Sequence, residues 1–189
     1  MEGFLRTIGQ FISLNETEKD LFQKIVTVQP LTKNSFFIRE GQICSRIAFV
    51  ESGMLRHFYY TDKNDVTRWV SLKNTFSTSF ASFIKETPSH ENIQAIQDSV
   101  ILTISKMDWQ KLCDQYPTIH EIWVKNIESL YIGMEERVFS LIALQAEQRY
   151  EFLCNTYPEF IKEVPLKFIA SMLGMEPRHL SRIRSRIQK

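Results

Sequence analysis

Residues 166–187 read LKFIASMLGMEPRHLSRIRSRI, which fits the pattern of two short helices joined by a tight turn. Ala170 is the small residue needed where the two helices cross, and Gly174 supplies the turn, which often requires positive φ. Pro177 suits the first turn of the second helix because its φ is fixed and it lacks an N–H donor. We therefore predict a helix-turn-helix held together by an apolar set: Ile169, Leu173, Met175, Leu180 and Ile183.

Positive charge is concentrated on the second of these helices. Residues 177–189 carry five Arg or Lys side chains and no acidic one, whereas the other 176 residues carry 18 basic and 22 acidic side chains. At 100° per residue, four of the five lie opposite Leu180, Ile183 and Ile187: Arg178, Arg182, Arg186 and Lys189. A solvated surface face usually mixes both signs, so this face is predicted to enter the major groove of DNA. Its residues are Arg178, His179, Ser181, Arg182, Ser185, Arg186 and Lys189, with Arg178 and Arg182 as readers of bases.

The N-terminal half has the pattern of an antiparallel β structure. Its first thirty residues read as helical, with Asn15 and Glu18 at the spacing of a capping box. From residue 28 to 105, short runs rich in Phe, Tyr, Val and Ile end at turn signals such as Gly41 and Gly53. This pattern predicts an α+β protein with a small antiparallel sandwich or barrel.

Helical periodicity returns after residue 105. Within this part of the sequence, Pro117 separates a short predicted helix from a long one. Thr118 and Glu121 have capping-box spacing at the predicted start of the long helix, which should continue to about Leu144. Apolar residues along it follow a heptad-like spacing that is interrupted at Arg137. A core helix packed on two sides would have a similar sequence pattern. The length of the predicted helix and its two apolar stripes favour a dimer seam instead. The seam residues are Trp123, Ile127, Leu130, Met134 and Leu141, and we expect Tyr131, Val138 and Ile142 beside them to face the barrel.

Together these features resemble the cyclic-AMP receptor protein/FNR family of bacterial transcription regulators. The resemblance covers essentially the whole chain and is most specific in REGQICSRIAFVESGMLR (39–56), RYEFLCNTYPEF (149–160) and VPLKFIASMLGMEPRHLSRIR (164–184). It implies three domains: an effector barrel of the double-stranded β-helix or jelly-roll type with N-terminal helices (1–117), a dimerisation helix (118–145) and a DNA-binding helix-turn-helix domain (146–189). Such a homodimer reads a palindromic site in double-stranded DNA, and RNA polymerase is a further candidate partner.

Three features depart from that family. Its cyclic-nucleotide binders hold the ribose with a glutamate and the cyclic phosphate with an arginine, but an ungapped comparison places Thr78-Ser79-Phe80 and Ser89-His90-Glu91 there. A buried phosphate without a cation is poorly compensated, so we predict no binding of cAMP or cGMP of the family type. The clustered cysteines of the iron–sulfur members are missing. The sequence stops at Lys189, so we expect no DNA contacts from the β-hairpin wing that usually follows.

The barrel nevertheless has a candidate effector pocket between residues 74 and 91, where a short helical turn on the barrel wall is expected. The candidate residues are Phe76, Ser77, Thr78, Ser79, Ser82, Ser89 and His90. These hydroxyl groups would suit a small polar or amphipathic ligand, whereas the alternative is a collapsed pocket filled by phenylalanines. The effector stays unknown, and no cofactor or metal is predicted, because Cys44, Cys113 and Cys154 are far apart.

Several function classes are excluded by the sequence. No nucleophile–base constellation, Walker loop or metal-ligand spacing is present, so we expect no enzyme. No apolar run approaches the ~20 residues of a membrane helix, and the first residues, MEGFLRTIGQ, lack the basic-then-apolar order of a secretory signal, so we expect a cytoplasmic protein without a membrane partner. Two functions remain: a homodimeric, sequence-specific transcription regulator, or a small-molecule sensor with weak or vestigial DNA binding.

Overall fold

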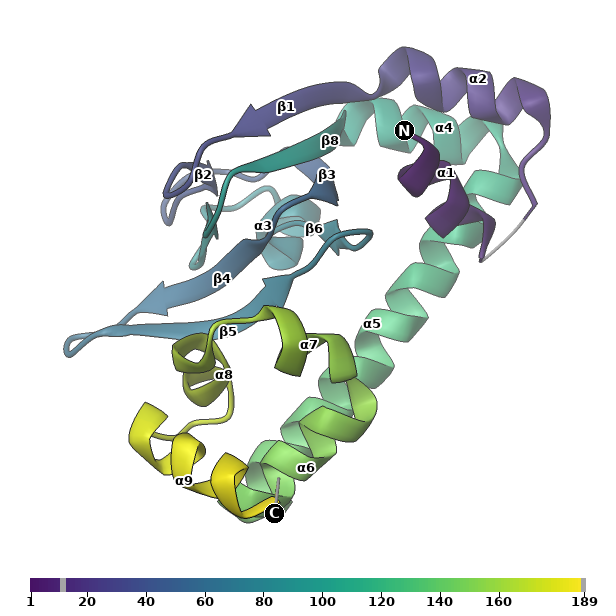
Figure 1. Cartoon of the computed structure of the whole chain (residues 1–189). Helices are drawn as coiled ribbons and strands as arrows, with labels where there is room; N and C mark the ends of the chain where they lie inside the picture. The colour runs from purple at the N-terminus through teal and green to yellow at the C-terminus, as the bar shows by residue number, and fades with distance from the viewer. Residues whose placement is uncertain (11–12, 188–189) are drawn as a thin grey trace.

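The computed structural model describes residues 1–10 and 13–187. Figure 1 shows a β region at one end, a long helix α5 that runs away from it, and a group of short helices beside the far half of α5. Among the described residues, none of the helices combines the length and apolarity that crossing a bilayer requires.

The strands of the described residues form two four-stranded antiparallel sheets, with the orders β1-β8-β3-β6 and β2-β7-β4-β5. Their bounds are β1 Thr27–Leu31, β2 Phe36–Ile38, β3 Arg46–Ser52, β4 Leu55–Tyr60, β5 Asp65–Ser71, β6 Phe76–Ser77, β7 Asn92–Ala95 and β8 Ser99–Ser105. The predicted antiparallel β structure is confirmed as a jelly-roll-like fold. The closed barrel is not found, because the end strands of one sheet do not pair with those of the other. We refer to residues 27–105 as the jelly roll.

The central β3–β8 pair is buried on both faces, which explains its nearly continuous apolar sequence. Ala48 and Val50 pack toward the other sheet, where they meet Leu55 and Ile93. The alternate residues, including Phe49, pack against the helices on the opposite side. The jelly roll is therefore the middle of a layered core.

The helices of the described chain are α1 Glu2–Gly9, α2 Glu16–Ile25, α3 Phe80–Lys85, α4 Lys106–Gln115, α5 Pro117–Ala143, α6 Ala146–Thr156, α7 Pro158–Glu163, α8 Leu166–Met172 and α9 Pro177–Ile187. The capping box of Asn15 and Glu18 is confirmed, with both reciprocal bonds at 2.9 Å. The box predicted for Thr118 and Glu121 is wrong. Pro117 is already the first residue of α5, and no side chain caps this end, because proline leaves one fewer donor to satisfy.

The first turns of the long helix pack into the core at the jelly-roll end of the molecule, where Ile119 and Ile122 are buried. Beyond them it diverges from the sheets (Figure 1). Tyr131, Val138 and Ile142 are 65%, 48% and 80% exposed, so the expectation that they face the barrel is wrong. The divergence of the helix turns this face to solvent.

Candidate functional site

α8 and α9 pack against each other across a tight turn. Gly174 has φ of 66°, as its predicted role in the turn requires, and the N–H of Met175 donates to the carbonyl of Ala170 at 3.0 Å. The predicted apolar set lies between the two helices: Ile169, Ala170, Leu173, Leu180 and Ile183 are buried, and Met175 packs against them. The sequence pattern therefore describes the local contacts of this helix pair correctly.

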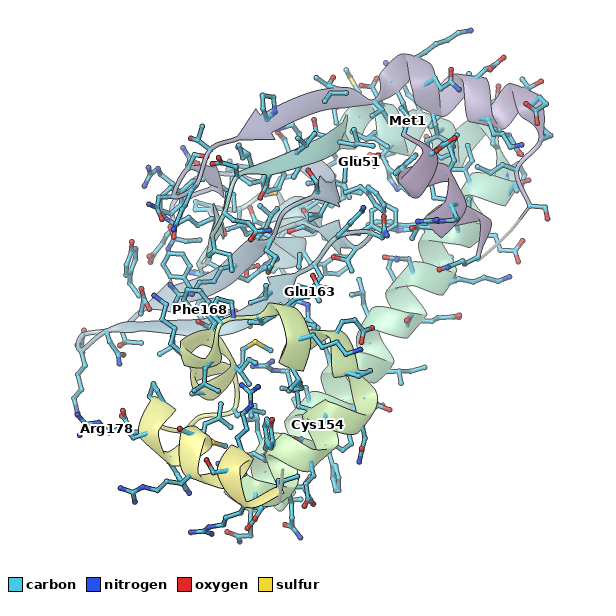
Figure 2. All side chains as sticks on the ribbon, in the orientation of Figure 1. Met1, Glu51, Cys154, Glu163, Phe168 and Arg178 are labelled. Carbon is cyan, nitrogen blue, oxygen red and sulfur yellow. The ribbon has the colours of Figure 1, made fainter. Side chains whose placement is uncertain are left out.

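The opposite side of α9 carries the basic side chains. Its predicted DNA-facing residues within the described range are all exposed: Arg178, His179, Ser181, Arg182, Ser185 and Arg186. Among the described residues, no salt bridge involves these arginines, and Arg178 lies on the outer end of α9 (Figure 2). Lys189 lies outside the described residues. Ile187 is 41% exposed, so the apolar face of α9 is shorter than predicted.

α8 is held on the edge of the jelly roll. The N–H of Thr67, on the end strand β5, donates to Ser171 Oγ at 2.8 Å. The guanidinium of Arg56 lies 4.5 Å from the centre of the Phe168 ring and is paired with Asp65; Phe168 is labelled at this boundary in Figure 2. An uncovered edge strand leaves main-chain groups unpaired, and α8 supplies a partner for one of them on β5, while the basic side of α9 stays exposed.

The hydroxyl groups predicted to line an effector pocket bond within the protein. Ser79 and Ser89 are both buried, and their Oγ atoms lie 2.8 Å apart. Ser82 and Thr78 each donate to a main-chain carbonyl, at 2.6 and 3.0 Å. Each of these groups is thus satisfied without a ligand.

The other candidate pocket residues do not surround a common opening. His90 is exposed, and Phe76 packs edge-on against Phe49 at 5.4 Å. A surface cavity of about 690 Å³ lies between the β2–β3 loop and the start of α4, near Ile43 and Met107, and none of the seven candidates lines it. This arrangement fits the alternative of a collapsed pocket better than that of an open pocket for a small ligand.

A buried polar network inside the jelly roll was not predicted from the sequence. Nδ1 of His57 lies 3.3 Å from Glu91 Oε2, and Nε of Arg68 donates to the same oxygen at 3.0 Å. On the other side of the ring, Nε2 lies 2.9 Å from Ser71 Oγ and 3.0 Å from Ser77 Oγ. Residues from β4, β5 and β6, and Glu91 directly before β7, therefore meet at His57.

The strand register explains how Arg68 reaches this network. His57 pairs with Trp69 and Phe58 with Thr67, so Arg68 is the extra residue of a bulge between β4 and β5. Bulges commonly re-aim a side chain. The available sequence signal was weak: His57 and Arg68 are polar residues within strands, and nothing near them in the sequence indicates that both reach Glu91.

Burial and charge set the protonation of this network. Burial lowers the pKa of His57, which keeps the ring neutral at neutral pH, and we assign its proton to Nδ1, where Glu91 can accept it. Burial by itself raises the pKa of Glu91, but the hydrogen bond from His57, the charge that His57 carries when protonated, and the charge of Arg68 outweigh it and lower that pKa to about 2. The network thus contains one carboxylate, one guanidinium and a neutral imidazole.

The predicted seam of α5 divides into two parts. Trp123 packs inside its own chain, 5.6 Å from Trp109 and 6.1 Å from Phe83 between ring centres, and Ile127 is half-buried. The remaining seam residues are exposed by 38–51%: Leu130, Met134 and Leu141. At 100° per residue they share one side of the helix with Tyr131, Val138 and Ile142, so the exposed apolar face is broader than predicted.

Comparisons with known proteins identify the β region and the fold. Residues 28–116 match the cyclic nucleotide-binding domain family. A mutant of CooA from Carboxydothermus hydrogenoformans has a TM-score of 0.73 at 18% identity, over 98% of this chain and 84% of that chain. FixK2 from Bradyrhizobium japonicum has a TM-score of 0.71 at 15% identity, over 87% of this chain and 85% of that chain. No curated protein matches the chain in sequence.

A third solved structure is described as a transcriptional regulator of the Crp/Fnr family from Eubacterium rectale. It has a TM-score of 0.63 at 16% identity, over 93% of this chain and 84% of that chain. At these low sequence identities, the similarity to the three solved structures shows a shared fold and no more. Residues 28–116 therefore match the cyclic nucleotide-binding domain family, and the chain shares its overall fold with solved structures that include one described as belonging to the Crp/Fnr family.

Proposed function

We propose that this protein is a homodimeric transcription regulator that binds DNA through a helix-turn-helix formed by α8 and α9. The observation that carries the proposal is the exposed, acid-free basic face of α9 behind a buried apolar face. Arginine side chains near the start of such a helix can donate two hydrogen bonds to guanine. Arg178 and Arg182 take this role, while Arg186 binds phosphate and adds affinity without sequence information.

The exposed apolar face of α5 supports the dimer. Seven large apolar side chains on one side of this helix are 37–80% exposed: Val124, Leu130, Tyr131, Met134, Val138, Leu141 and Ile142. Contiguous apolar surface of this kind marks an interaction site, and pairing with a second α5 would bury it. Such a dimer presents two α9 helices to successive turns of DNA, about 34 Å apart, so its site is an inverted repeat.

The jelly roll is the sensing region of the proposed regulator, and its effector is not a cyclic nucleotide. The positions compared with the family's ribose and phosphate ligands are two buried serines that bond to each other. They offer no cation to a cyclic phosphate. Any effector would have to displace these internal hydrogen bonds or bind outside them.

A DNA titration tests the proposed function. The protein is titrated with genomic fragments and with the inverted repeat selected from them, by fluorescence anisotropy at several salt concentrations. We expect binding that weakens steeply with salt, and an Arg178→Ala/Arg182→Ala variant that loses discrimination by about 10-fold or more.

The matched control is Lys24→Ala/Lys33→Ala, which removes the same charge from exposed positions outside α9 and should leave discrimination unchanged. If neither the wild type nor its variants bind DNA above background, the alternative of a small-molecule sensor with vestigial DNA binding replaces this proposal. Equal loss in both double variants would show a general charge effect rather than base reading.

A further inference from the structure

Arg137 breaks the apolar row of α5, and the structure shows what it contacts instead. Its Nη2 donates to the carbonyl of Met172 at 3.2 Å, and its guanidinium carbon lies 5.7 Å from the centre of the Trp69 ring. One side chain thus joins α5 to the jelly-roll strand β5 and to the last residue of α8. These are the three parts whose relative placement fixes α9.

The carbonyl that Arg137 contacts lies at the end of a helix. Carbonyls in the last turn lack partners within the helix, and a cation there is favourable. Met172 is the last residue of α8 and directly precedes the turn that contains Gly174 and leads into α9. The contact therefore holds the α8–α9 pair where its direction is decided.

The charge of Arg137 has no carboxylate partner among the described residues. Burial, together with a smaller contribution from the neighbouring charge of Arg68, lowers its pKa to about 10, so the group stays protonated at neutral pH. Arg68 itself is paired with Glu91. The guanidinium of Arg137 is thus engaged by the Met172 carbonyl dipole and the face of Trp69.

The Trp69 side of this contact is rigid. Its ring packs on Phe160 at 4.7 Å and on Tyr157 at 5.3 Å between ring centres. The bond from Thr67 to Ser171 fixes the middle of α8 on the same strand. Arg137 adds the link between this assembly and α5.

We propose that Arg137 is a positioning residue that sets the separation of the two α9 helices in the dimer, and so makes DNA binding selective for one half-site spacing. The inference rests on the proposed function. If α5 carries the dimer axis and α9 reads one half-site, a fixed link between them fixes the distance between the half-sites. Loosening that link widens the range of spacings that the dimer accepts.

The test compares the wild type with Arg137→Met, Arg137→Lys and Arg6→Met. Each protein is titrated with inverted repeats whose half-sites are moved one or two base pairs closer or farther apart. We expect the wild type to prefer one spacing by about 10-fold or more, since a misplaced half-site loses its base contacts. Arg137→Met should reduce this preference several-fold, and Arg137→Lys, which keeps a cationic donor, should restore part of it.

Arg6→Met is the matched control, because it makes the same change at an exposed position of α1 and should keep the wild-type profile. An Arg137→Met protein that folds and keeps the wild-type spacing profile overturns the proposal. If Arg137→Met fails to fold, Arg137→Lys provides the test. Lysine lacks the planar guanidinium group, so an Arg137→Lys protein with the wild-type spacing profile also overturns the proposal.

A second measurement separates this inference from the proposed function. Spin labels at Ser185→Cys, in a Cys113→Ser/Cys154→Ser background, report the distance between the two α9 helices without DNA. We expect a narrow distribution in the wild type and a clearly broader one in Arg137→Met. Equal widths contradict the positioning role even if the protein binds DNA, whereas broadening supports it even if no DNA site is found.

Discussion

The hydroxyl oxygens of Ser79 and Ser89 lie 2.8 Å apart in the interior of the jelly roll. They occupy the positions that, in ungapped comparison, hold the glutamate and arginine of cyclic-nucleotide binders. Both side chains are buried, and Ser89 Oγ also donates to the carbonyl of Glu91 at 2.8 Å. On that comparison, we predict that a neutral hydrogen bond takes the place of the two charges that would hold a nucleotide.

The first prediction concerns cyclic nucleotides. We expect cAMP and cGMP at millimolar concentration to give no saturable heat in isothermal titration calorimetry and no shift in melting temperature, because the phosphate would be buried without a cation. AMP serves as the non-cyclic control. Saturable binding of either cyclic nucleotide, but not of AMP, would contradict the role we assign to the two serines.

Acid should weaken the fold through Glu91. Its pKa in the folded protein is about 2, below the ordinary value of 4.5, so the unfolded chain binds a proton first as the pH falls. The stabilisation is complete above pH 4.5 and is lost between about 4.5 and about 2, with a size of about 3 kcal/mol. Burial lowers the pKa of His57 as well, so His57 adds a loss of stability that begins as the pH falls through its ordinary value.

Urea unfolding at stepped pH measures this effect. Glu91→Gln should be less stable than the wild type at pH 7 by about 3 kcal/mol, because Arg68 loses its carboxylate partner, and its stability should fall less steeply below pH 4.5. Glu163→Gln on α7, which is exposed, should keep the wild-type slope. Parallel slopes in the wild type and Glu91→Gln would show that another group controls acid unfolding.

Charge on the exposed face of α5 should dissociate the dimer. We expect Leu130→Glu/Leu141→Glu to raise the dimer dissociation constant by at least ~100-fold, because burying a carboxylate costs several kcal/mol. Ile132 lies on a different side of α5 and is 56% exposed, so Ile132→Glu is the control and should stay dimeric. Sedimentation velocity distinguishes the two, and a monomeric wild type would refute the seam.

Two turn glycines should differ in their tolerance of alanine. Gly41 and Gly53 have φ of 84° and 89°, but a Cβ on Gly53 would lie 2.6 Å from the Cα of Ser99, whereas one on Gly41 meets nothing within 4 Å. Gly41→Ala should therefore cost about 1–2 kcal/mol for the backbone conformation alone. Gly53→Ala should cost clearly more, because main-chain atoms must move as well. Chemical denaturation measures both, and equal costs would contradict the steric argument.

The sequence by itself determined the features that depend on near neighbours. The helix pair with its turn at Gly174, the two sides of α9 and the capping box at Asn15 follow from helical periodicity and cap chemistry over a few residues. The match of residues 28–116 to the cyclic nucleotide-binding domain family also fits the predicted β region. The predicted domain boundaries, DNA contacts and dimer stay predictions.

Only the tertiary structure decided which distant residues meet. His57 and Glu91 are 34 residues apart, and Thr67 and Ser171 are 104 apart. Strand register, a bulge at Arg68 and the docking of α8 on β5 bring them together, and none of these has a local signature. The same holds for Arg137: the sequence showed that it breaks an apolar row, but its partner, the Met172 carbonyl, is a main-chain atom that every residue has. Long-range contacts depend on how whole elements pack, and that packing minimises the free energy of the chain as a whole rather than of any short segment.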